Sequence, residues 1–149
     1  MKKLFFLIML IAFTQALAQI KDTQRYEIVL TQIEQAFDTG NMNNIWALLN
    51  SRITIRIEDS LYRDASDIQV EALLKSFFET KDSLKFKFAG KSFHMNGAES
   101  NGLLSYTADN KRSSLYVDVY LSGLKGDILI YAMNLSNYPS STVFYNFYK

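Results

Sequence analysis

The chain has 149 residues, with 16 basic and 15 acidic side chains, one histidine and no cysteine. A nearly neutral domain has no electrostatic reason to seek nucleic acid or an anionic membrane surface, so we expect neither as a partner. The absence of cysteine excludes disulfides, and with a single histidine it also argues against a zinc site. No Asp-rich calcium loop occurs either, and we expect no metal and no cofactor.

Residues 1–18 have the pattern of a secretory signal peptide. A basic start is followed by an unbroken apolar run from Leu4 to Phe13 and by the small-x-small cleavage signal Ala16-Leu17-Ala18. The apolar run is too short to span a bilayer, which takes about 20 residues. No cysteine follows for attachment of a lipid. We therefore expect cleavage before Gln19 and a periplasmic or secreted protein with no membrane anchor.

Residues 19–138 are predicted to form one domain that begins with helices. A first amphipathic helix ends at Gly40, and its apolar positions recur at three- and four-residue steps: Tyr26, Val29, Leu30, Ile33, Ala36 and Phe37. Asn41 is suited to cap a short second helix that carries Ile45 and Trp46. Alternation from Ile53 to Ile57 then predicts a half-buried strand.

A capping box from Ser66 to Gln69 predicts the start of a third helix. We expect it to pack on a sheet through Leu73, Leu74 and Phe77. After Thr80 the apolar period changes to two, which predicts four antiparallel strands. Their apolar positions fall in Leu84–Phe88, Leu104–Ala108, Leu115–Leu121 and from Ile128 onward, and turns are expected at Asn96-Gly97, Asp109-Asn110-Lys111 and Gly123–Gly126.

Helices grouped before strands predict an α+β fold, with N-terminal helices packed on one face of a curved, mostly antiparallel sheet. Pro139 closes the regular region, and residues 139–149 are predicted to be a polar-aromatic tail. Neither an internal repeat nor an interdomain linker is visible in the sequence.

Two stretches carry a resemblance to known proteins. Phe37-Asp-Thr-Gly40-Asn41 and Trp46-Ala-Leu-Leu49 resemble the opening of the nuclear-transport-factor-two-like superfamily, the cone or cystatin-like α+β fold. Leu61-Tyr62, Gln69 and Leu73–Phe78 are similar to a family of small secreted bacterial proteins with this fold and no assigned function. The resemblance implies the fold, and it leaves the activity open because the superfamily contains enzymes, binders and dimerisation modules.

Four aromatic residues are candidates for lining a pocket in the cone, where a small apolar ligand would bind: Trp46, Tyr62, Phe77 and Phe78. The same residues could instead simply fill the core. Ketosteroid-isomerase-like relatives use an Asp base with a Tyr and a protonated Asp. None of these catalytic residues maps onto a matching position here, and we name no catalytic residue. His94 has no acid or nucleophile at useful spacing and is interpreted as an ordinary strand-end residue.

Tyr116, Asp118 and Tyr120 are predicted to lie on the sheet face away from the helices. Two interpretations of the tyrosines stay open: a homodimer surface, or cross-strand aromatic pairs that stabilise the sheet alone. In a dimer, Asp118 would need a cation from the partner, and Lys85 or Lys87 is the nearest candidate by type. The sequence thus favours an exported, non-catalytic binding or association module, with a small lyase or isomerase acting in the cone as the alternative.

Overall fold

The computed structural model describes residues 23–94, 96–123 and 126–138. The predicted signal peptide, residues 1–18, and the predicted tail, residues 139–149, lie outside the described residues. So does the middle of the predicted turn at Gly123–Gly126.

Six strands form one sheet in the order β2-β1-β6-β5-β4-β3. The β1–β6 pair is parallel, and the other neighbouring pairs are antiparallel. This mixed, mostly antiparallel sheet confirms the predicted fold class. The strands are β1 (Leu49–Ile57), β2 (Ser60–Ala65), β3 (Asp82–His94), β4 (Gly97–Ala108), β5 (Lys111–Ser122) and β6 (Leu129–Ser136).

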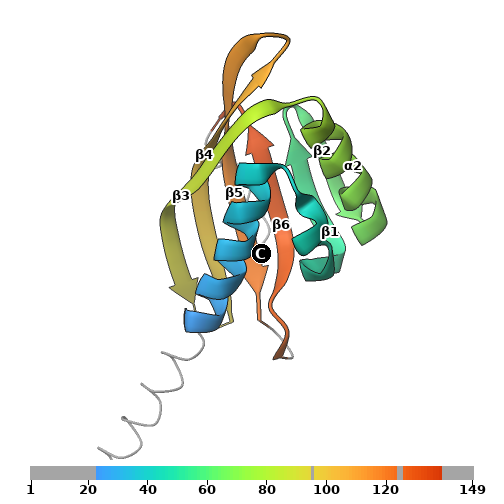
Figure 1. Cartoon of the computed structure of the whole chain (residues 1–149). Helices are drawn as coiled ribbons and strands as arrows, with labels where there is room; N and C mark the ends of the chain where they lie inside the picture. Colours follow the sequence, from blue (N-terminus) through green and yellow to red (C-terminus); the bar gives the residue numbers. More distant parts are fainter. Residues whose placement is uncertain (1–22, 95, 124–125, 139–149) are drawn as a thin grey trace, which may run out of the picture.

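The helices lie on one face of this sheet, as predicted (Figure 1). The N-terminal helix covers residues 23–39 of the described chain, and α2 (Asp67–Glu79) packs near β1 and β2. The predicted second helix is instead a pair of short 3-10 turns, η1 (Met42–Asn44) and η2 (Trp46–Leu48). Asn41 caps η1 as expected, because its side-chain oxygen accepts a hydrogen bond from the Asn43 N–H.

The capping box at the start of α2 is confirmed. Ser66 Oγ accepts from the Gln69 N–H at 3.3 Å, and Gln69 Oε1 accepts from the Ser66 N–H at 3.0 Å. The helix buries Leu74 and Phe77 as predicted, together with Val70 and Phe78, while Leu73 is half-buried. The predicted buried side of α2 is therefore confirmed, with Leu73 at its edge.

Strand β2 was not predicted. The turn after β1 was expected, but the chain then returns along β1 with Ile57 opposite Ser60 and Ile55 opposite Tyr62. Most of β2 is exposed, so it lacks the alternation of apolar residues by which a strand is recognised in a sequence. Pairing with β1 holds it, and it forms one edge of the sheet.

A line of aromatic rings fills the space between the helices and the sheet. Phe37 of the N-terminal helix lies 5.3 Å from Phe86 and 5.1 Å from Phe78, between ring centroids. The line continues from Phe86 to Phe88 at 4.8 Å, and from Phe78 through Phe77 to Tyr106 at 5.0 and 6.0 Å. Tilted and edge-to-face contacts of this kind stabilise a core beyond the area they bury.

The hairpins of the sheet follow the predicted turns. His94 pairs with Gly97, so Asn96 lies in the β3–β4 loop and Gly97 begins β4. A side chain at Gly97 would approach the Leu121 carbonyl oxygen to 2.6 Å, which explains the glycine. Asp109 and Asn110 both have positive φ, at 49° and 60°, as a two-residue hairpin turn requires.

The N-terminal helix also closes the edge of the sheet formed by β3. Glu34 and Asp38 are four residues apart on the helix, so both carboxylates point toward the same strand. Glu34 Oε2 accepts from the Phe88 N–H and Asp38 Oδ1 accepts from the Phe86 N–H, each at 2.9 Å. These two carboxylates, here called the edge clasp, satisfy N–H groups that no neighbouring strand reaches.

We predict that the edge clasp stabilises the fold. Glu34→Ala with Asp38→Ala leaves both N–H groups without their acceptor and should lower the free energy of unfolding by about 1 kcal/mol per lost bond. Urea unfolding measures this loss. The matched variant Glu34→Gln with Asp38→Asn keeps an oxygen acceptor at both sites and should lose less. An equal loss in both variants would show that the carboxylate charge, and not the hydrogen bonds, matters.

We also predict that the buried ring of Phe77 contributes strongly to the free energy of unfolding. Phe77→Ala removes a buried ring that contacts Phe78 and Tyr106 and should cost roughly 3–5 kcal/mol in denaturant melts. Ile68 lies on the same helix but is exposed, so Ile68→Ala is the control and should cost little. A loss below about 1 kcal/mol for Phe77→Ala would contradict the described packing.

Candidate functional site

The face of the sheet opposite the helices, here called the outer face, is the strongest candidate for a functional surface. Leu115, Val117, Val119 and Leu121 of β5 belong to the core, so the residues between them point outward. Asp118 lies opposite Asn134 of β6, and Tyr116 lies opposite Ser136. The helices of the described chain leave this face uncovered (Figure 1).

A fixed polar group occupies the centre of the outer face. Asn134 Nδ2 donates to Asp118 Oδ2 at 2.8 Å and to Ser136 Oγ at 3.1 Å, and Ser136 Oγ donates to the Tyr138 carbonyl at 2.7 Å. Arg56 of β1 stands beside Asn134 in the parallel register. Arg56, Asn134 and Asp118 thus form a row across three neighbouring strands, here called the polar row.

Asp118 is on the predicted face, but its surroundings differ from the prediction. We expected a carboxylate on the open sheet face that, in a dimer, would need a cation or donor from the partner. Instead the side chain is buried, and Asn134 of the same chain supplies its donor. Lys85 and Lys87 lie on β3, two strands away from β5 in the sheet. Within one chain, neither lysine is the partner of Asp118.

Large apolar side chains surround the polar row and are exposed. Tyr116 and Tyr131 are exposed on β5 and β6, and Leu103 of β4 lies directly opposite Tyr116 and is exposed as well. Tyr120, the third residue of the predicted dimer surface, is half-buried. The outer face therefore combines a buried polar centre with exposed apolar side chains on β4, β5 and β6, here called the rim.

A shallow depression lies beside this rim at the β3 edge. Its volume is about 570 Å³ and it is open to solvent, with Lys85 and Lys87 standing opposite Ser105 and Leu103. The remaining lining residues are Asp38, Leu84, Phe86 and Ala89.

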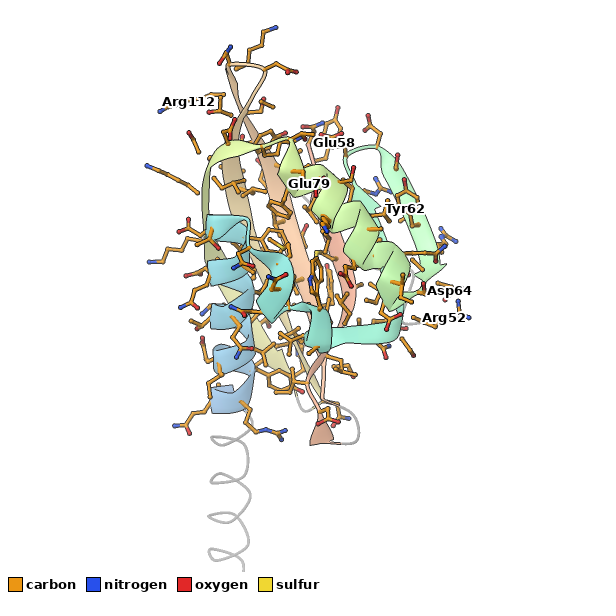
Figure 2. The ribbon with its side chains drawn as sticks, turned by 45° about the vertical axis from the view of Figure 1, so that its right-hand side comes forward. Arg52, Glu58, Tyr62, Asp64, Glu79 and Arg112 are labelled. Carbon is orange, nitrogen blue, oxygen red and sulfur yellow. The ribbon has the colours of Figure 1, made fainter. Side chains whose placement is uncertain are left out.

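The four predicted pocket residues come from three elements, α2, η2 and β2. Phe77 and Phe78 are in contact and buried in the aromatic line. Trp46 is half-buried on η2. Tyr62 is exposed on β2, the edge strand of the sheet (Figure 2). The ring contacts of the described residues join Phe77 and Phe78 to Phe37 and Tyr106, but not to Trp46 or Tyr62.

Tyr106 is the phenol at the end of the aromatic line. Burial raises its pKa above the ordinary value, and the nearby Glu58 carboxylate raises it further, while a hydrogen bond with Ser113 acts in the opposite direction. Lys81 Nζ lies 4.7 Å from the Phe77 ring centroid and 5.4 Å from that of Tyr106. A phenol with a raised pKa stays neutral at physiological pH and acts here as a core residue with a polar end.

His94 ends β3 in an exposed position. Its Nε2 lies 3.9 Å from Oε1 of Glu99, an acid that we did not expect near it from the sequence. Both side chains are about half exposed, so water screens the pair. The described residues contain no group of His, Asp and Glu side chains arranged to hold a metal ion, and no described helix is long and apolar enough to cross a membrane.

Asn134 and Arg56 are the residues of this surface that sequence reasoning missed. The alternation of β5 placed Asp118 correctly, but pairing Asp118 with Asn134 requires the register of β6, 16 residues away. A β-bulge between Tyr120 and Leu121 shifts the register of this strand pair. Ala132, Asn134 and Ser136 alternate in β6, and this pattern is the signal that could have marked them as one face.

The helices on a curved sheet define a nuclear-transport-factor-two-like fold, and solved structures agree. A protein of unknown function with this fold from Shewanella oneidensis superposes with a TM-score of 0.60 at 14% identity, covering 78% of this chain and 99% of that one. A de novo designed protein with a curved β-sheet gives 0.58 at 11% identity, covering 74% and 97%. Identities this low establish the fold alone.

The family follows from a more specific match. Residues 30–135 match the family described as Domain of unknown function (DUF4783), and the chain belongs to this family. A protein of the same family from Bacteroides uniformis superposes with a TM-score of 0.65 at 14% identity, covering 73% of this chain and 96% of that one. A comparison with curated proteins gave no significant match.

Proposed function

We propose that this protein is an exported, non-catalytic module that binds a partner through the outer face of its sheet. The observation that carries the proposal is the exposed rim formed by Tyr116, Tyr131 and Leu103 on a face that the described helices leave uncovered. Tyrosine supplies a large apolar area with a polar end and is enriched at protein interfaces.

The chemistry of the interior supports binding over catalysis. A lyase or isomerase acting in the cone would need an acid or base that faces the interior. Among the described residues, the one buried carboxylate is that of Asp118, and it points to the outer face. The aromatic line occupies the interior at the mouth of the cone, between the N-terminal helix and α2.

A second copy of the chain is the partner that we propose for the rim. A two-fold pairing sets each rim against the same surface of the other copy. The full chain has a net charge of +1, and the proposed cleavage removes Lys2 and Lys3 and no acid, which leaves −1, so there is little long-range repulsion between two copies. Since Asn134 Nδ2 already donates to Asp118 Oδ2, such a dimer does not leave this carboxylate without a hydrogen-bond donor.

Analytical ultracentrifugation at tens of micromolar tests the dimer. We expect a dimer for the unmodified chain and a folded monomer for Tyr116→Glu with Leu103→Glu, because opposed carboxylates replace apolar contacts. Ile68 is an exposed apolar residue on α2, away from the outer face, so Ile68→Glu is the matched control and should stay dimeric. A monomeric unmodified chain would exclude the homodimer.

Export is the second part of the proposal, and it is supported by the pattern of residues 1–18. We expect cleavage between Ala18 and Gln19, so that the mature protein loses the basic start and the apolar run. Mass spectrometry of the protein from the periplasm or the culture medium gives its N-terminal residue. A mature protein that retains Lys2 and Lys3 would contradict this part of the proposal.

A further inference from the structure

The centre of the outer face is buried although no helix or strand of the described residues lies over it. Asn134 has no exposed surface and Ala132 is 4% exposed, whereas Leu103 and Tyr116 on the same face are 46% and 42% exposed. Side chains on a bare sheet shield one another only in part, so a layer over this patch, here called the cover, would account for the difference. The patch is local, because Tyr116 of β5 and Tyr131 of β6 are exposed on the same face.

Two buried atoms of the polar row indicate which hydrogen-bonding groups the cover would supply. Asn134 Oδ1 is an acceptor and Arg56 Nε is a donor, and neither has a hydrogen-bond partner among the described residues. They belong to cross-strand neighbours on one face. A buried polar atom without a partner is costly, so the two atoms together call for a donor and an acceptor close to each other. A peptide main chain carries this pair at every residue.

The path of the chain brings a suitable segment to the same place. β6 ends at Ser136, whose hydroxyl lies on the outer face and holds the Tyr138 carbonyl. Residues 139–149 come next, and eleven residues reach about 36 Å when extended. Neighbouring strands are about 4.8 Å apart, so this length is ample to cross β6, β1 and β5. The segment contains the apolar residues Val143, Phe144, Tyr145, Phe147 and Tyr148.

We propose that residues 139–149 dock on the outer face of their own sheet, over the polar row. The main chain of the segment bonds to Asn134 Oδ1 and Arg56 Nε, and its aromatic side chains pack around Ala132. The segment leaves the rim of Tyr116, Tyr131 and Leu103 available for the proposed dimer. Docking of this segment does not depend on the proposed dimer, since it concerns a different part of the face and requires no second copy.

The lack of cysteine allows a direct test with single thiol probes in the full chain. Ala132→Cys places a thiol under the proposed segment, and Ile68→Cys places one at an exposed position of α2, away from the outer face. We expect maleimide to label Cys at position 132 about ten-fold more slowly than at position 68, or slower still. Thr54→Cys, which pairs with Ala132 from β1, is a second probe in case the first variant unfolds.

The segment itself is then changed. Phe144→Asp with Phe147→Asp should release it and raise labelling at position 132 by about ten-fold, since charged side chains favour water over an apolar site. Ser140→Asp with Ser141→Asp adds the same charge at polar positions and should leave the rate low. Fast labelling at position 132 in the unmodified segment overturns the proposal. So does protection that survives the Phe144 and Phe147 changes, or that disappears on dilution, because a second copy would then be the cover.

Discussion

The packing of the N-terminal helix on the sheet is the interaction on which the rest of the fold depends. Leu30, Ile33 and Phe37 are fully buried along one side of this helix. The next side carries Glu34 and Asp38, which reach the backbone of β3. One orientation of the helix therefore seats Phe37 in the aromatic line and both carboxylates on the strand. A rotation by one residue would break both sets of contacts at once.

Local signals explain which elements the sequence predicts well. The capping box of α2 lies within four residues, and the alternation of β5 lies within one strand, so each is visible without knowledge of the fold. β2 carries no such signal, because it is an exposed edge strand held by its pairing with β1. The predicted second helix became 3-10 turns because β1 already begins at Leu49, which leaves too few residues for a stable helix.

The candidate site was predictable only in part, since it depends on contacts between distant residues. Strand alternation alone places Tyr116 and Asp118 on the outer face. The donor of Asp118, in contrast, comes from Asn134 on another strand, and Arg56 stands beside Asn134 because β1 pairs in parallel with β6. A parallel pair joins segments far apart in the chain, and no turn residue announces its register. The polar row therefore becomes visible only in three dimensions.

The edge clasp also bears on whether a further strand can pair with the β3 edge of the sheet. An exposed edge strand is a template for adding further strands, and sheets that grow in this way form open fibres. At β3, an incoming strand finds the Phe86 and Phe88 N–H groups already bonded to carboxylates. At β2, the opposite edge, Asp64 has a φ of 51°, which interrupts the extended backbone that such growth requires. Both margins therefore carry features that disfavour edge-to-edge polymerisation.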